Sequence, residues 1–396
     1  MDKAAFYAPL VRGAIIARLG RPCVVVRAQE ALDGTVVTLS GAEDEKDAAA
    51  LITRAVAGAE KVPCRVTLNV GGETIPFMAG EDFSAVALLE GGGSVDFPST
   101  VGVENIVNVR ARTMRNRVCL VTGGAQGFGE EIVRGLCEGG AIVFIADLNL
   151  AGAQALAEKL NGEHGGKTVA FAVEVNVGDE ASVAAMFEKV ALTTGGLDLC
   201  VSNAGVLRAQ PILEQDIGAF AFVTGINYTG FAIITKHAGL LMRRQFLAAD
   251  AAASADAAAS PWPTDIIQIN SKSGLEGSNK NGAYAGSKFG GIGLVQSFAK
   301  ELVDYGIKVN AVCPGNFFDG PLWSDPEKGL FAQYLRTGKV PGAKTVADVK
   351  AFYEAKVPMG RGCCGPDVLR AIYYLVEQVY ETGQALPVTG GQVMLS

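Results

Sequence analysis

The sequence predicts an α/β protein built on a doubly wound parallel sheet, preceded by a smaller α+β domain. Uninterrupted apolar runs such as 117–122 and 141–146 alternate with helical patterns through the last two thirds of the chain, which is typical of strands buried on both faces. A glycine-rich turn separates the first of these runs from the next helical pattern. The length of 396 residues exceeds one typical domain.

The glycine-rich turn after the strand 117–122 predicts a dinucleotide cradle. Glycines at these positions permit a tight turn and let the backbone approach a pyrophosphate closely. The helix expected over 130–138 would direct its amide groups and the positive end of its dipole at phosphate. The residues expected in this cradle are Gly123, Gln126, Gly127, Phe128 and Gly129.

The strand expected over 141–146 leads to Asp147 and Leu148, eighteen and nineteen residues after the last cradle glycine. An acid at this distance is placed to accept hydrogen bonds from a ribose diol and to repel a 2′-phosphate. No Arg or Lys occupies 124–126 or directly follows Asp147. The pattern therefore favours NAD over NADP as cofactor.

A second constellation predicts proton transfer. The strand expected over 265–270 delivers Ser271 at its carboxyl end, where open α/β sheets bind ligands. Tyr284 and Lys288 follow at an i, i+4 spacing on one helix face. A tyrosine has a pKa of about 10, and a nearby ammonium lowers it. We expect Tyr284 to exchange a proton with a substrate oxygen that Ser271 orients, and Lys288 also to hold the nicotinamide ribose.

Together these motifs resemble the short-chain dehydrogenase/reductase family over about 112–396. The resemblance implies a Rossmann core, hydride transfer to NAD, Asn227 as a fourth catalytic residue that holds a helix kink, and subunit contacts through helices around 214–246 and 282–304. It adds cofactor contacts at Asn176, Val177, Asn203, Ala204, Gly205, Pro314 and Gly315. Asn176 stands where the family usually has Asp, Ser202 replaces an Asn, and the turn after Gly315 lacks the usual Thr.

Within the family, the stretches 268–274, 288–294, 356–363 and 389–394 resemble members that oxidise sorbitol 6-phosphate at C2. This likeness implies interconversion of a sugar-alcohol phosphate and a ketose phosphate, such as sorbitol 6-phosphate and fructose 6-phosphate. A phosphate needs cations, and the candidates are Lys272, Lys280 and Arg361. Further pocket candidates are Ser273, Asn316, Phe317 and Trp323, and the segment 316–360 is expected to form a substrate lid.

Two other hypotheses stay open. The chain could reduce another ketone or act on an unphosphorylated polyol, in which case phosphorylated ketoses would not turn over. It could also bind NAD without catalysis and use residues 1–111 as its working surface, although the intact catalytic set argues against this.

The sequence outside the catalytic motifs predicts a small α+β domain over 1–100, a linker over 101–111, a catalytic domain over 112–396 and a mobile surface insertion at about 247–264. The small domain should contain strands over 22–27 and 34–39, a helix over 47–59 and a hairpin over 65–78. Its expected role is structural or in assembly.

Composition narrows the function classes. The net charge of −7 and the lack of a basic run argue against a nucleic-acid-binding protein. No apolar run has membrane length, so we expect a cytoplasmic protein with a small-molecule substrate. The family resemblance implies a homodimer or homotetramer. The eight cysteines form no C-x-x-C, and the histidines, His164 and His237, have no ligand partners nearby, so no metal site is expected.

Overall fold

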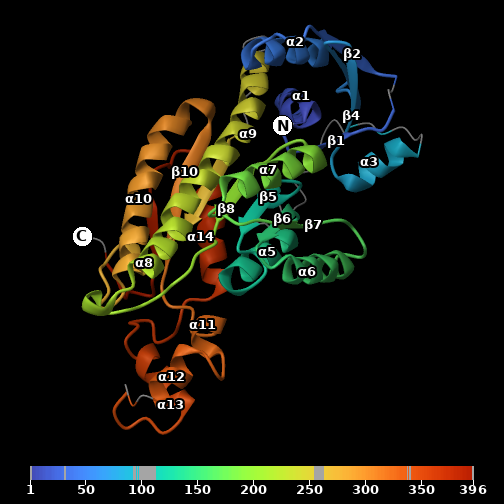
Figure 1. The fold of residues 1–396 in the computed structure, drawn as a ribbon. Coiled ribbons are helices and arrows are strands. Elements are labelled where there is room, and N and C mark those ends of the chain that lie inside the picture. The colour runs from blue at the N-terminus through green and yellow to red at the C-terminus, as the bar shows by residue number, and fades with distance from the viewer. Residues whose placement is uncertain are drawn as a thin grey trace.

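The computed structural model describes residues 2–30, 33–91, 95, 97, 113–253, 263–336, 338 and 340–394. Its main body is a seven-stranded sheet in the order β11-β10-β9-β8-β5-β6-β7, and all neighbouring pairs are parallel (Figure 1). The strands are β5 (Val118–Thr122), β6 (Ile142–Asp147), β7 (Ala170–Glu174), β8 (Leu199–Ser202), β9 (Thr264–Ile269), β10 (Ile307–Pro314) and β11 (Ala385–Val388). The predicted doubly wound parallel sheet is confirmed.

Helices cover both faces of this sheet, which explains why its central strands are apolar without alternation. One layer consists of α5 (Gly127–Glu138), α6 (Leu150–Glu163) and α14 (Gly365–Glu377). The other consists of α7 (Glu180–Thr194), α9 (Gly230–Ala253) and α10 (Gly282–Leu302). Every residue of β5, β8, β9 and β10 is buried.

A second, four-stranded sheet is formed by the first 80 residues in the order β1-β4-β3-β2. Its strands are β1 (Val24–Arg27), β2 (Thr35–Leu39), β3 (Arg65–Val70) and β4 (Glu73–Gly80), and its helices are α1 (Lys3–Leu19), α2 (Glu45–Gly58) and α3 (Phe83–Glu90). The predicted hairpin is the antiparallel pair β3 and β4. The sequence did not lead us to expect α1 or α3. The predicted linker over 101–111 lies outside the described residues.

The N-terminal unit is joined to the catalytic body by a buried interface. Helix α1 packs against α7 and α9 (Figure 1). Within it, Arg12 and Asp198 form an ion pair at 2.7 Å in which both side chains are fully buried. Asp198 directly precedes β8, and one of its carboxylate oxygens also accepts the backbone N–H of Val118 at the start of β5. The unit therefore covers the amino edge of the large sheet, opposite the edge where ligands bind.

Helix α9, which follows the turn that carries Asn227, is longer than predicted. Helix α9 continues to Ala253, so the expected insertion at 247–264 is helical over its first seven residues, because α1 and α2 supply a partner for them. Ala248 and Ala252 are buried, and the Thr53 hydroxyl donates to the Ala248 carbonyl at 2.8 Å. Residues 254–262 of the predicted insertion lie outside the described residues.

One helical stretch, Ile217–Ala252, is long and apolar enough to cross a membrane by length and composition, which differs from the sequence expectation. It comprises α8 (Ile217–Thr224), the π-helical turn η3 (Gly225–Thr229) and α9. Its buried Ile234, Ala238 and Met242 belong to the cluster that packs on the large sheet. One side of the stretch therefore packs on the sheet.

The segment after β10 forms a separate lobe that projects from the body below the carboxyl edge of the sheet (Figure 1). It contains α11 (Pro321–Ser324), α12 (Leu330–Arg336) and α13 (Val346–Glu354). Phe318, Phe331, Val340, Val349 and Val357 make its own hydrophobic core.

Candidate active site

The cradle has the geometry that close approach of a phosphate needs. Gly123 and Gly127 both adopt φ of +61°, which favours glycine. A Cβ on Gly129 would lie 1.9 Å from the Gly123 carbonyl oxygen, so only glycine allows this turn, whereas a Cβ on Gly127 would meet no atom within 4 Å. Gln126 precedes α5 without capping it. The amide groups at the start of α5 and the open space at Gly127 fit a pyrophosphate.

The adenosine side of the cradle is built around the end of β6. The Asp147 carboxylate accepts the N–H groups of Ala125 at 3.0 Å and Asn149 at 2.9 Å. Each oxygen keeps a further lone pair for a ribose hydroxyl. Leu148 beside it is largely exposed, Asn176 accepts the N–H of Gly178, and Val177 is buried.

The cradle is tied to the centre of the sheet by Asn203. Its Nδ2 donates to the carbonyls of Thr122 and Gly123, each at 3.0 Å. The Thr122 hydroxyl in turn accepts the N–H groups of Asn203 and Ala204. On the other side of the site, the Gly315 N–H after Pro314 donates to the Val388 carbonyl. These hydrogen bonds hold in place the backbone segments on which a dinucleotide would lie.

Ser271 and Tyr284 meet above the carboxyl ends of β9 and β10. Ser271 begins the short helix η4 (Lys272–Gly274), and its hydroxyl accepts the Ser273 N–H at 3.1 Å. Burial raises the pKa of the Tyr284 phenol more than a hydrogen bond with Ser271 lowers it, so the pKa lies above its ordinary value. The serine therefore lies where it can contact both the phenol and a substrate oxygen.

Lys288 lies behind this pair. Its Nζ donates to the Ile269 carbonyl at 2.9 Å and lies 5.6 Å from the centre of the Tyr284 ring. Burial lowers the pKa of Lys288 to about 8. We expected Lys288 to acidify Tyr284, but in this structure its ammonium is held toward β9, and burial instead dominates the pKa of the phenol.

Asn227 lies in the π-helical turn η3, which is a local widening of the helix. Its Nδ2 donates to the Val206 carbonyl at 2.9 Å and to the Ser287 hydroxyl at 3.1 Å, and its Oδ1 accepts the Val206 N–H. A Cβ on Gly205 would lie 3.3 Å from Asn227 Oδ1 and 3.7 Å from Lys288 Nζ. The structure thus brings Asn227, Ser271, Tyr284 and Lys288 together.

Of the predicted phosphate ligands, Lys272 lies next to the catalytic serine. Its side chain is half-buried, and burial lowers its pKa, partly offset by Glu276. Among the residues that the structure describes, none forms a hydrogen bond or ion pair with its ammonium group. Ser273 beside it is buried. Lys280 is exposed, in the loop before Tyr284, with φ of +59°.

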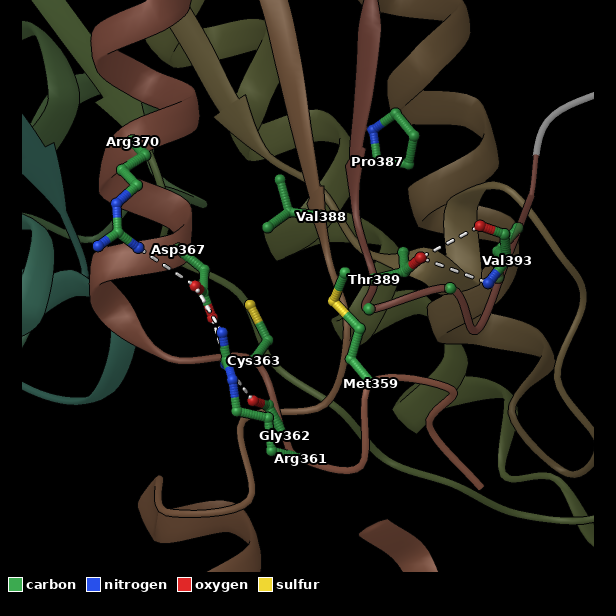
Figure 2. A pocket seen from close by; sticks show the side chains of 12 residues that line it. Met359, Arg361, Gly362, Cys363, Asp367, Arg370, Pro387, Val388, Thr389 and Val393 are labelled. Carbon is green, nitrogen blue, oxygen red and sulfur yellow. Dashed lines mark hydrogen bonds and ion pairs between the residues drawn. The ribbon is translucent and has the colours of Figure 1, made fainter. Parts of the chain in front are cut away.

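Arg361 has a different environment. Both of its terminal nitrogens bond the Asp367 carboxylate, at 2.6 and 3.0 Å, and Figure 2 shows them directed at α14. Arg361 and Asp367 line a cavity of about 430 Å³ between α14 and β11, and none of the four catalytic candidates lines it. Asn316, another of the predicted substrate residues, is half-buried, and its carbonyl accepts the Cys363 N–H.

Two residues named from the sequence meet here: Phe128 of the cradle stacks on Phe317 of the lobe, with ring centres 4.4 Å apart and planes at 15°. The structure adds two residues that the sequence analysis did not single out. Gln268 and Asn270 place buried amides beside Ser271. Two amide side chains at the end of a run rich in isoleucine were a signal for these buried amides. No group of His, Cys, Asp and Glu suited to a metal occurs within the described part of the chain.

Comparisons with known proteins agree with this geometry. The family model for short chain dehydrogenases matches residues 117–321. The chain is 34% identical over 282 residues to sorbitol-6-phosphate 2-dehydrogenase of Escherichia coli, covering 70% of this chain and 99% of that protein. It is also 34% identical to cis-4-hydroxycyclohexanecarboxylate dehydrogenase of Sinomonas cyclohexanicum, covering 69% of this chain and 96% of that protein.

Among solved structures, sorbitol-6-phosphate 2-dehydrogenase of Erwinia amylovora matches with a TM-score of 0.62 and 35% identity, covering 70% of this chain and 100% of that chain. The predicted family is therefore confirmed, together with an alcohol-oxidising activity that uses a nicotinamide cofactor. This chain belongs to the short-chain dehydrogenase family.

Proposed function

We propose that the protein is an NAD-dependent dehydrogenase that interconverts a sugar-alcohol phosphate and a ketose phosphate, with sorbitol 6-phosphate and fructose 6-phosphate as the leading pair. The observation that carries the substrate class is the half-buried ammonium of Lys272, which follows Ser271 and has no partner in the described chain. The two relatives that act on sorbitol 6-phosphate support the same class. Another relative, which is also 34% identical to this chain, acts on a hydroxycyclohexanecarboxylate. Sequence identity therefore does not distinguish the two substrates, and the test addresses the contact with phosphate.

The choice of NAD rests on charge at the adenosine side. Asp147 presents a carboxylate at the end of β6, and its nearest hydrogen bonds come from backbone N–H groups rather than from a cation. A 2′-phosphate at this place would be repelled by the carboxylate. A ribose diol can donate hydrogen bonds to it.

The catalytic roles follow from the geometry of the four side chains. Ser271 would hydrogen-bond the substrate oxygen and hold it against the Tyr284 phenol, which takes the hydroxyl proton during oxidation and returns it during reduction. Lys288 would hold a ribose hydroxyl, and Asn227 keeps Ser287 and the loop after β8 in place. The nicotinamide, when bound, accepts or donates the hydride. Gly315 and Phe317 would border it on the lobe side.

A phosphate dianion would form an ion pair with the ammonium group of Lys272. Burial lowers its pKa and Glu276 offsets only part of that effect, so a bound anion would further stabilise the protonated form. A hydrogen bond to a charged group contributes about 1.5–3 kcal/mol. Loss of that contact corresponds to about a 10- to 150-fold weaker binding.

The test follows NADH absorbance with sorbitol 6-phosphate and with free sorbitol, using the wild type, Lys272→Met and the matched control Lys300→Met, which removes an exposed lysine at the far end of α10. We expect turnover of the phosphate only, and a KM for it raised about 10- to 100-fold by Lys272→Met alone. Turnover of unphosphorylated polyols or other alcohols, with none of sorbitol 6-phosphate, would support the second candidate, a dehydrogenase for another ketone or polyol. NAD binding without turnover of any alcohol would contradict both.

We further propose that subunits associate through the helices α8 and α10. Ile217 and Phe222 on α8, Phe289 on α10 and Tyr228 in the adjoining turn η3 are exposed in the single chain. An exposed apolar group of this kind is typical of a protein interface. A homodimer or homotetramer in light scattering would support this, and a monomer at micromolar concentration would contradict it.

A further inference from the structure

We propose that Asn270 is a positioning residue for the reaction, because its buried side-chain amide joins the strand end that carries Ser271 to the helical turn that carries Lys288. The inference rests on the proposed roles of Ser271 and Tyr284. It does not depend on which alcohol is the substrate.

Asn270 is the first residue after β9 and is almost fully buried. Its Oδ1 accepts the N–H of Ser271 at 2.8 Å. Its Nδ2 donates to the Lys288 carbonyl at 2.9 Å and to Gln268 Oε1 at 2.7 Å. One amide therefore contacts the backbone of both catalytic segments and uses both of its donors and its acceptor.

The surrounding chain leaves a closed space for this amide. A Cβ on Gly274 would lie 2.2 Å from Asn270 Oδ1, and a Cβ on Gly291 would lie 3.1 Å from Asn270 Nδ2 and 2.7 Å from Gln268 Nε2. Glycine at both positions lets η4 and α10 approach β9 closely enough for the bonds to form. Any other side chain at 270 has to leave these buried donors and acceptors unpaired or move the elements apart.

Asn270 also determines how Lys288 is held. The Lys288 ammonium donates to the Ile269 carbonyl, one residue before Asn270, and the Lys288 carbonyl accepts from Asn270 itself. Both ends of the lysine are thus bound to the same two residues of the strand end. Loosening the backbone contact would let the α10 turn with Tyr284 shift relative to Ser271.

The consequence for catalysis can be separated from a loss of stability. The hydrogen bond with Ser271 lowers the pKa of Tyr284, against the upward effect of burial. A longer or broken Ser271–Tyr284 contact would therefore raise that pKa further. Oxidation needs the phenolate, so its rate would reach half-maximum at a higher pH. A residue that only supports folding would not move this value.

The experiment compares the full-length wild type with Asn270→Leu, which keeps the volume without adding a charge but loses the acceptor and both donors, and Asn270→Ser, which loses the bridge and is small enough to avoid a clash. The matched control is Gln245→Leu. The Gln245 amide is equally buried and bonds the backbone of Leu197, at 2.6 and 3.0 Å, but at the amino edge of the sheet. Tyr284→Phe is measured alongside.

We expect both Asn270 variants to lower kcat about 10- to 100-fold, to shift the pH profile of alcohol oxidation upward, and to bind NADH within about twofold of the wild type, as judged by fluorescence titration. Gln245→Leu should lose thermal stability and keep the wild-type pH profile. Asn270 variants with wild-type kcat and pH profile would overturn the positioning role, while an inactive Tyr284→Phe would leave the proposed function standing. An active Tyr284→Phe would overturn both.

Discussion

Replacing Arg12 by Met should destabilise the whole protein, although residue 12 lies far from the catalytic groups. In the wild type, the guanidinium bonds both oxygens of Asp198, at 3.0 and 2.7 Å, and donates from Nε to the Cys23 carbonyl at 2.8 Å. Both side chains are fully buried. Met fills a similar volume but leaves the Asp198 carboxylate with a single hydrogen bond, from the Val118 N–H.

The magnitude follows from the burial. Breaking a buried ion pair by removing one partner costs about 3–5 kcal/mol, because the remaining charge stays in an apolar environment. Removing one partner of an exposed pair costs about 1 kcal/mol or less. Lys3 and Glu73 form such an exposed pair at 2.9 Å in the same unit, so Lys3→Met is the matched control.

Urea unfolding followed by far-ultraviolet circular dichroism is the suitable assay. One of the two tryptophans, Trp323, belongs to the lobe and would report on that segment. We expect Arg12→Met to lower the unfolding free energy by about 3–5 kcal/mol, and the double variant Arg12→Met/Asp198→Asn to recover part of the loss, since Asn stays neutral and can still accept the Val118 N–H. A loss below about 1 kcal/mol for Arg12→Met, similar to Lys3→Met, would refute this reasoning.

Two further predictions concern the site. Lys288→Met should abolish turnover yet raise the unfolding free energy at pH 7, because burial lowers the pKa of Lys288 to about 8 from an ordinary 10.5 and its buried charge opposes folding below about pH 8. The wild type should accordingly gain stability between about pH 8 and 10.5. A variant less stable than the wild type at pH 7 would contradict this. For Phe128 and Phe317, a double-mutant cycle with Leu at each position should give a coupling of about 0.5–1.5 kcal/mol in thermal unfolding, and additive effects would show that the stacked rings contribute nothing beyond their separate burial.

The catalytic half of the chain was predictable because its central strands are buried on both faces and lead directly to residues of the site. Ser271 after β9 and Asp147 at the end of β6 lie where the sequence placed them. The substrate side was less accessible to sequence reasoning. Arg361 and Lys272 look alike as isolated cations, and only the structure shows that Asp367 bonds the first while nothing in the described chain bonds the second.

The N-terminal third was harder to predict, for a physical reason. Helix α1 is buried on nearly all sides between the small sheet and α9, so it lacks the polar face from which an amphipathic helix is recognised. Arg12 within it looked like a charge in an apolar run, since its partner lies 186 residues away. The Ala-rich stretch after residue 247 lacked apolar anchors of its own, because α1 and α2 provide them.

The packing of α1 against α9 also has a consequence for the order of synthesis. Helix α1 ends at Leu19, but α9 ends at Ala253, so the ribosome makes the second partner more than two hundred residues after the first. At about 5–20 residues per second, the nascent α1 waits roughly 10–50 s for α9 to be made. During that time its apolar surface is covered only on the side of the small sheet, and a chaperone or another chain can bind the other side.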